Sequence, residues 1–479
     1  MPRLSRFALL TSLVLTASCG GGGDGRFDVL LVGSEEAALS EEPPYGEAAK
    51  LVREATGSGL VALDAEGRIR PDLAARWIVT DDGLSYIFRI ERQPDAIDTN
   101  AAPPTAPEVR KALLAAIRDM KGTGLARDLD VIDGIYARTS QVIEIRLRTA
   151  MPEFLQLMAV PELSLKLPEG ETDALDLTAD GPLLTLSEPV FEDRTAGTLD
   201  IRVAKAKDAV ERFQRGEAEL MLGGGIDALP HVEFGLLRGT IRLDPVAGLF
   251  GLAVADSEGF LAEASNREAL AMAIDRDALI APFKIGGWTP RTRLVPVGLP
   301  GTQQPPGRWD DLSIEQRQGF AAQRVAGWVA SNGAVAPLTI ALPTGTGGNI
   351  LFRRLSADLG RIGLAAKRVG PDENADLRLV DEVAYLDRPE WYLHRLDCTV
   401  IRAVCSADAD ALVYEALGET AAPRRDALLA EAEAMLTAQN GFISFGPPIR
   451  FSLVRGGVAG FAINRWGFHP LSQLFVDTN

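Results

Sequence analysis

The stretch LDIRVAKAKDAVERFQRGEAELMLGGG at residues 199–225 indicates which kind of fold this chain adopts. Residues 199–203 alternate in the manner of a strand, and residues 206–215 have the spacing of an amphipathic helix. A second apolar run at residues 220–222 is entered through Gly216 and followed by three glycines. A strand, a helix and a strand in this order predict a parallel sheet covered by helices, and therefore an α/β fold.

The same order occurs a second time, later in the chain. Residues 338–342 read as a strand, residues 349–362 as a helix and residues 376–380 as the returning strand. The chain has 479 residues, whereas single hydrophobic cores stop growing at roughly 250–300 residues. We therefore expect two α/β lobes of similar construction.

Three further segments have the apolar spacing of helices: residues 106–120, 265–280 and 424–439. In the second of them, Ser265 and Glu268 have the spacing of a capping box, in which each side chain bonds a free N–H at the helix start. The sequence thus predicts one continuous helix that begins at Ser265.

Charge and composition exclude several classes of function. The formal net charge of −17 argues against a nucleic-acid partner, because phosphate binding needs clustered Lys and Arg. The three histidines lie far apart and no HExxH or CxxC occurs, so we expect no zinc or iron site and no cofactor. No G-x-S-x-G elbow is present. Two acidic pairs read as solvated or helix-starting charges, so we expect no enzyme: Glu431 with Glu433, and Asp408 with Asp410.

Residues 1–19 have the features of an export signal. Arg3 and Arg6 supply the positive start, and residues 7–15 form an apolar run too short to span a bilayer. The run ends in small residues directly before Cys19, a pattern that resembles a bacterial lipobox, with ordinary cleavage as the alternative. Residues 20–26 contain four consecutive glycines and read as a flexible tether. We expect a protein held at the outer side of a membrane by a lipid on Cys19.

The other two cysteines, Cys398 and Cys405, then lie in a compartment outside the cytosol. An even pair at this short spacing is compatible with a disulfide that closes a small loop. Two independent buried thiols are equally compatible with the spacing, because spacing alone does not fix geometry.

Four stretches resemble family 5 of the extracellular solute-binding proteins, which includes the peptide, dipeptide and nickel-binding components of ABC transporters. The most specific is PDLAARW at residues 71–77 followed by DGLSYIF at residues 82–88. The second is NREALAMAIDR at residues 266–276, and the others span residues 338–369 and 450–470. The similarity covers about residues 50–475, with the four stretches in the family's order.

The resemblance implies a two-lobed periplasmic-binding-protein-like fold, with a ligand cleft between the lobes and a smaller subdomain inserted near the N-terminus. Residues 246–255 would be one of two strands that cross between the lobes. The implied boundaries place residues 27–55, 175–250 and 445–479 in lobe I, residues 56–174 in the inserted subdomain and residues 251–444 in lobe II.

The resemblance also implies a function and its partners. The protein would capture a peptide-like or other small polar organic solute by closing its lobes, and would deliver it to an ABC-transporter permease. It would act as a lipid-anchored monomer in the periplasm or cell envelope. The alternative is a degenerate member of the family that acts as a non-transport interaction or scaffold lipoprotein.

Two departures from the family pattern bear on the ligand. Only PTAPEV at residues 104–109 remains of a longer motif in the insert, since the stretch 95–102 lacks its His-Asp-Gly. In the segment YLDRPEWYL at residues 385–393, Tyr385 stands where peptide binders carry an Asp that pairs with a peptide's amino terminus. A desolvated amino group needs an anionic partner, so either another acid substitutes or the ligand is no ordinary peptide.

Candidate ligand contacts follow from this position and from the aromatic side chains near it. We expect the strand ending near residue 380 to open at the inter-lobe crevice, where α/β sheets bind ligands. Packing of the aromatic side chains in the core is the alternative to ligand contact, and the glycine-rich loop 345–349 reads as a tight turn or as a weak anion cradle. The predicted contacts are Asp381, Glu382, Tyr385, Asp387, Trp391, Tyr392, Trp288 and Phe250.

Overall fold

The computed structural model describes residues 26–91, 102–167, 172, 174–188, 197–235, 239–299, 308–309, 311–401 and 403–475. The predicted signal segment, Cys19 and most of the tether lie outside these residues, as does most of the stretch 95–102. Within the described part of the chain, no helix is both long and apolar enough to cross a bilayer.

The first sheet has seven strands in the order β12-β18-β11-β1-β10-β9-β8. Strand β1 pairs in parallel with both β10 and β11, so it lies between the two strands of the predicted strand-helix-strand unit. The predicted parallel pairing is confirmed, and helix α6 (Ala206–Gln214) connects the two strands. The strands are β1 (Arg26–Val32), β8 (Asp176–Asp180), β9 (Leu183–Ser187), β10 (Thr198–Ala204), β11 (Leu220–Gly224), β12 (Ile241–Leu243) and β18 (Phe451–Val454).

The second sheet has five strands in the order β15-β14-β16-β13-β17. The predicted second unit is confirmed, with one strand more than expected: β15 pairs in parallel with β14 on one side, and β16 does so on the other. Helix α10 (Thr346–Arg361) connects β14 to β15. The strands are β13 (Gly248–Val254), β14 (Leu338–Ala341), β15 (Ala366–Val369), β16 (Leu377–Val383) and β17 (Phe442–Gly446).

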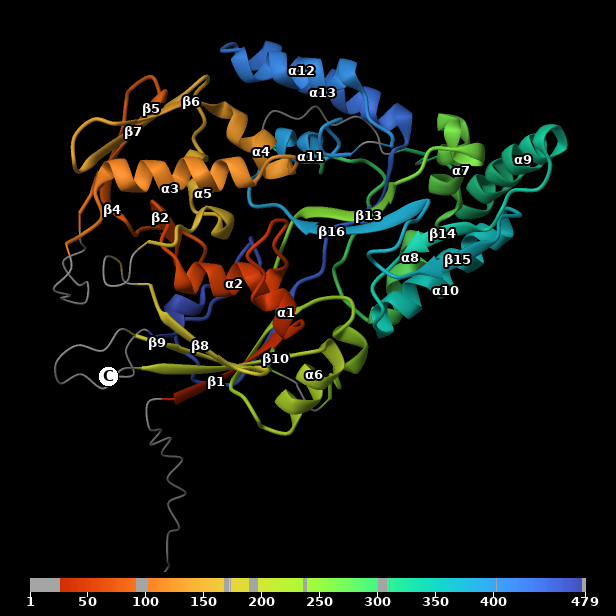
Figure 1. Ribbon diagram of the computed structural model, residues 1–479. Coiled ribbons are helices and arrows are strands. Elements are labelled where there is room, and N and C mark those ends of the chain that lie inside the picture. The colour runs from red at the N-terminus through yellow and green to blue at the C-terminus, as the bar shows by residue number, and fades with distance from the viewer. Residues whose placement is uncertain are drawn as a thin grey trace, which may run out of the picture.

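The chain passes between these two sheets twice. It leaves the first sheet after β12 to form β13, and it returns from β17 to β18. All seven residues of β13 are buried, as the apolar run at residues 246–255 predicted for a crossing strand. We call the unit around the seven-stranded sheet lobe I and the unit around the five-stranded sheet lobe II; they lie side by side in Figure 1.

A third unit, here called the insert, lies between β1 and β8 in the sequence and occupies the upper left of Figure 1. Its sheet has the order β4-β5-β7-β6, and the short pair β2 and β3 stands beside it. Trp77 on β4 pairs with Phe88 on β5, which places the two family-like motifs on adjacent strands. The strands are β2 (Val61–Leu63), β3 (Ile69–Pro71), β4 (Ala74–Val79), β5 (Ser85–Ile90), β6 (Ile132–Ala137) and β7 (Val142–Leu147).

The single helix predicted for residues 265–280 is wrong, because the structure has two helices there. Helix α7 (Ala264–Ala273) ends at Ile274, whose ψ of 119° is extended, and α8 (Arg276–Ile280) starts anew. Asp275 caps α8 by accepting a bond from the N–H of Ala278. The guanidinium of Arg276 donates to the carbonyls of Ala271 and Ile274, which satisfies backbone groups that a continuous helix would have paired.

Ser265 is likewise not the cap of α7, since the N-cap residue is Glu263. Capping boxes are instead found at two other helices: Thr105 and Glu108 bond each other's backbone at the start of α3, and Ser313 and Gln316 do so at the start of α9 (Ile314–Asn332). The predicted helices 106–120 and 424–439 are confirmed as α3 and α13. These two helices span Ala106–Asp119 (α3) and Ala422–Gln439 (α13). The remaining helices are α1 (Glu35–Ala38), α2 (Glu47–Thr56), α4 (Gly124–Asp128), α5 (Phe154–Met158), α9 (Ile314–Asn332), α11 (Pro389–His394) and α12 (Ala407–Gly418).

Between α11 and α12 the structure joins Cys398 and Cys405 by a disulfide, with a Cα–Cα distance of 5.1 Å. The bridge closes the short loop that leads into α12, where Asp408 and Asp410 occupy the first turn, as the sequence predicted. Its presence in the exported protein stays a prediction.

Candidate ligand site

A cavity of about 50 Å³ lies where lobe I, lobe II and the insert meet. Lobe I contributes Glu47 and Lys50 from α2, and the insert contributes Glu162. Tyr385 comes from the segment after β16, and Trp466 from the segment after β18. Known ligand pockets measure roughly 300–1,000 Å³, so the lobes in this arrangement leave room for water but not for a peptide.

Lys50 is the lysine that lines this cavity. Its Nζ lies 3.1 Å from Glu162 and 3.8 Å from Glu47. Burial works against its charge, but Glu162, Glu47 and Glu382 raise the pKa of Lys50 well above its ordinary value. Lys50 therefore stays protonated, and three carboxylates surround it, a setting that suits a ligand carrying an ammonium group.

Each predicted acid of the segment after residue 380 has an arginine partner. Asp381, on β16, accepts a 2.8 Å bond from Arg450 next to β18, which joins the two lobes. Glu382 accepts a 3.0 Å bond from Arg395. Asp387 pairs with Arg465 of the C-terminal segment. In this arrangement all three carboxylates are already neutralised by the protein itself.

Tyr385, which replaces the family's Asp, belongs to a buried cluster around Asp128. Its hydroxyl donates to one oxygen of Asp128, at the C-terminal end of α4 in the insert. His394 lies 2.7 Å from the other oxygen, and Arg395 donates to Asp128 at 2.7 Å. Burial disfavours the charge of Asp128, but Arg395 and His394 hold its pKa below the ordinary value. A carboxylate at position 385 would face this anion, whereas a tyrosine hydroxyl donates to it.

Trp391 and Tyr392 belong to α11, and both side chains are buried in the protein core at 0% exposure. The guanidinium carbon of Arg395 is 3.9 Å from the centre of the Trp391 ring, and the two aromatic rings are 4.8 Å apart. Burial raises the pKa of Tyr392 to about 12, with Arg291 opposing the shift. Neither side chain lines the inter-lobe cavity. In this structure both therefore pack in the core, which was the alternative to contact with a ligand.

The remaining two predicted aromatic contacts also lie away from that cavity. Phe250 is fully buried on β13 and packs edge-on against Phe445, with ring centres 5.5 Å apart. Trp288 donates from its indole nitrogen to the carbonyl of Pro447, at 2.9 Å. It thereby covers the second crossing between the lobes, where Gly446 leaves space for the ring.

The glycine-rich loop 345–349 does cradle an anion, and the anion belongs to the protein. Asp227, which follows β11 in lobe I, accepts a 3.0 Å bond from the N–H of Gly348 at the start of α10 in lobe II. A Cβ on Gly345 would lie 2.4 Å from the Asp227 carboxylate, and one on Gly347 would lie 2.2 Å from the carbonyl of Ile226. The glycines thus allow the two lobes to touch.

Sequence reasoning missed the residues that connect the three units. Asp128, Lys50 and Asp227 stand in no motif, and their partners lie far away in the sequence. One signal was present for Asp227: a glycine string follows a strand in each lobe, and such strings mark close approach of two backbones. Among the described residues, no group of three His, Cys, Asp or Glu side chains is placed to hold a metal ion.

Several solved structures share this architecture over nearly the whole chain. Haemophilus influenzae OppA, solved in complex with RPPGFSPFR, gives a TM-score of 0.81 at 15% identity, covering 94% of this chain and 98% of OppA. The Escherichia coli murein tripeptide binding protein MppA gives 0.80 at 16% identity, covering 94% and 97%. AgaA from A. tumefacien R10, solved with agropinic acid, gives 0.71 at 15% identity, covering 94% and 98%.

The comparison also distinguishes two arrangements of the lobes. The unliganded open form of MppA gives a TM-score of only 0.62, below the 0.80 of the other MppA structure. The lobes of this chain are therefore arranged differently from that open form, in agreement with the contacts of Asp227 and Asp381 across the lobes. No protein-family model and no curated protein matches the sequence. The chain has the two-lobed α/β fold, with its inserted subdomain, of the peptide-binding components of ABC transporters.

Proposed function

We propose that this protein is an exported, lipid-anchored solute-binding protein that captures a peptide-like or other small polar organic solute and delivers it to an ABC-transporter permease. The observation that carries the proposal is the charged cavity around Lys50, which lies where lobe I, lobe II and the insert meet. The full-length likeness to structures solved with a peptide and with agropinic acid supports it. No catalytic step is part of this proposal.

The solute would enter when the lobes separate. Opening would break the contact between Asp227 and Gly348 and the pair of Asp381 with Arg450, because each joins one lobe to the other. The freed Asp381, together with Glu382, would then be available to a ligand's ammonium group. We propose Glu47, Lys50, Tyr385 and Trp466 as further contacts, because they line the space that closure leaves.

A mass-spectrometric experiment tests this proposal without assuming a ligand. The protein is purified under native conditions from its own host and denatured, and the released small molecules are identified. We expect a stoichiometric polar organic solute that is absent when Lys50→Gln is purified in parallel. Release of the same trace compounds by both proteins would contradict the proposal.

A non-transport interaction protein with this fold is the second candidate. The observation that favours it is that Asp381, Glu382 and Asp387 are all paired with arginines while the cavity holds only about 50 Å³. Small-angle scattering separates the two candidates. A solute-binding protein has an open form with a larger radius of gyration that shrinks on adding solute, whereas a locked scaffold keeps one radius throughout.

A further inference from the structure

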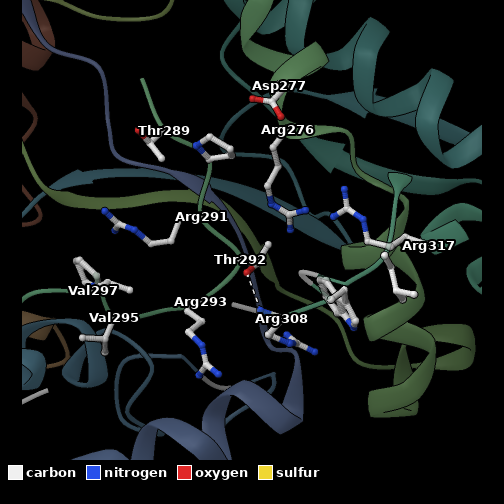
Figure 2. A pocket seen from close by; sticks show the side chains of 14 residues that line it. Arg276, Asp277, Thr289, Arg291, Thr292, Arg293, Val295, Val297, Arg308 and Arg317 are labelled. Carbon is white, nitrogen blue, oxygen red and sulfur yellow. Dashed lines mark hydrogen bonds between the residues drawn. The ribbon is translucent and has the colours of Figure 1, made fainter. Parts of the chain in front are cut away.

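A cavity larger than the inter-lobe one lies in lobe II. It measures about 510 Å³ and shares no lining residue with the cavity around Lys50. Five arginines line it: Arg276 from α8, Arg291 and Arg293 from the segment after it, Arg308, and Arg317 from α9. Figure 2 shows these side chains around the cavity: the guanidinium groups of Arg276 and Arg317 lie toward each other, whereas those of Arg291 and Arg293 point to other sides.

This concentration of cations stands out in a chain whose formal net charge is −17. Five acids among the described residues act on these arginines: Asp277 lines the cavity, Glu268 bonds Arg308 at 3.1 Å, Glu433 lies near Arg293, and Asp275 and Asp358 act on the charge of Arg276. Of these acids only Asp277 lines the cavity itself. The described lining thus presents five arginines and one carboxylate, a wall that a multiply charged anion would suit.

Arg276 is the most deeply placed of these cations, at 4% exposure. Its guanidinium donates to three backbone carbonyls, those of Ser444, Ala271 and Ile274, rather than to a carboxylate. Burial, followed by the charges of Arg317 and Arg308, lowers the pKa of Arg276 to about 9. A buried cation among like charges is costly unless an anion comes to it.

Two further arginines share this lack of a carboxylate among the described residues. The Nη1 of Arg291 donates to the carbonyl of Gly248 at 3.3 Å, and burial lowers the pKa of Arg291. The Nε of Arg317 is buried and has no hydrogen-bond partner. Guanidinium groups present planar pairs of donors that match carboxylate and phosphate oxygens, so these side chains are suited to bind an oxyanion.

The cavity has the size and the mixed wall of a small-molecule site. Its volume falls within the roughly 300–1,000 Å³ of known ligand pockets. Trp309 and Leu312 supply an apolar wall, and Arg308 stacks on the Trp309 ring at 4.2 Å from its centre. Such a wall accommodates the carbon skeleton of an organic anion while the arginines hold its charged groups.

We propose that the arginine cavity of lobe II is a second ligand site, which binds a small molecule bearing at least two phosphate or carboxylate groups. This site is separate from the solute cleft and does not depend on the proposed transport function. The same chemistry could come from a free metabolite or from an anionic lipid headgroup near the membrane anchor. The concave shape of the site favours a free anion.

Calorimetry on the whole mature chain tests the proposal, with pyrophosphate and citrate as probes at constant ionic strength. We expect saturable binding that Arg317→Gln weakens by about tenfold or more, because a charge-assisted contact is lost. The matched control is Arg324→Gln, an exposed arginine two turns further along α9, which should bind like the wild type. Equal affinity of all three proteins, or no binding beyond that of chloride, overturns the proposal.

Two further experiments identify where the anion binds and whether it is free or part of a lipid. Lys50→Gln changes only the inter-lobe cavity, so a loss of pyrophosphate binding in this variant would place the anion there and contradict the proposal. Flotation with phosphatidylglycerol vesicles tests the headgroup source; binding to vesicles but to neither free probe would overturn the free anion as the ligand.

A measurement on the wild type alone covers the case in which Arg317→Gln fails to fold. Phenylglyoxal modifies accessible arginines, and peptide mass spectrometry reports which ones. Pyrophosphate should protect Arg291 and Arg317 while Arg324 remains reactive. Equal modification of all three, with and without the anion, would contradict the site.

Discussion

At the scale of single residues, Tyr385 shows how one substitution fits its surroundings. The family-like segment calls for an acid at this position, but the buried carboxylate of Asp128 already lies against it. Burial and the charge of Asp128 raise the pKa of Tyr385 well above its ordinary value, so its hydroxyl stays protonated and donates. The cluster ties the insert to lobe II with a hydrogen bond that an ionised carboxylate at position 385 could not donate.

We therefore expect Tyr385→Asp to destabilise the protein by about 3–5 kcal/mol, because it buries a second carboxylate beside Asp128. Tyr385→Phe removes only the hydroxyl and should cost about 1–3 kcal/mol. Urea unfolding at pH 7 measures both values. If the Asp variant proved as stable as the Phe variant, the two carboxylates would not repel each other, and the account of this position would be wrong.

The same cluster predicts a pH dependence of stability. The pKa of Asp128 is lowered in the folded state, so its contribution is present above the unfolded pKa of about 3.9 and is lost as the pH falls through the folded value. The free energy of unfolding should fall less steeply below pH 4 in Asp128→Asn than in the wild type. Asp130→Asn, at a more exposed acid two residues away, is the matched control and should keep the wild-type slope.

At the scale of elements, the crossing strand and both strand-helix-strand units could be predicted, because apolar periodicity reports directly on local structure. The break between α7 and α8 could not, since it depends on Arg276 reaching backbone carbonyls in α7 and in β17. The aromatic residues of α11 gave an ambiguous signal. Periodicity reveals that a ring is buried, but not whether a ligand or the core covers it.

Substitutions of Trp391 and Trp466 distinguish a ring buried in the core from a ring that contacts a ligand. We expect Trp391→Ala to cost about 3–5 kcal/mol of stability, as for a fully buried ring. Trp466 lines the inter-lobe cavity, so Trp466→Ala should lower the affinity for the co-purified solute by about 5- to 150-fold. Thermal melts without solute and calorimetry with it measure the two effects. A reversal of the two outcomes would return Trp391 to the ligand site.

The contact between Asp227 and α10 predicts how closure is stabilised. A carboxylate at a helix N-terminus contributes about 0.5–2 kcal/mol, so Asp227→Ala should lower the closed-to-open ratio by about 2- to 30-fold. Gly345→Ala should act likewise, because its Cβ would displace that carboxylate. The control is Asp208→Ala, an exposed acid in the first turn of α6. Fluorescence transfer between dyes on the two lobes measures this ratio. Identical transfer in all variants would show that Asp227 does not stabilise the closed form.

At the scale of the whole molecule, the order of the motifs was enough to predict two lobes and an insert, and the solved structures confirm that fold. The site itself was less accessible to prediction. Lys50, Asp128 and Arg450 act through partners from other units, and only the folded chain brings these together. The arginine cavity is a similar case, since its five cations come from segments that no short motif connects.

Attachment of the whole molecule to a membrane would depend on one residue, the predicted lipidation site Cys19. Cys19 follows small residues and precedes a glycine tether, as in a bacterial lipobox. We therefore expect Cys19 to carry lipid, since two or more acyl chains give the stable anchoring that one chain does not. Metabolic labelling with a clickable fatty acid should mark the wild type but not Cys19→Ser, which should appear in the soluble fraction. Cys398→Ser, also lacking one thiol, should be labelled like the wild type. Equal labelling of all three proteins, or a membrane-bound Cys19→Ser, would show that something other than this cysteine holds the protein in place.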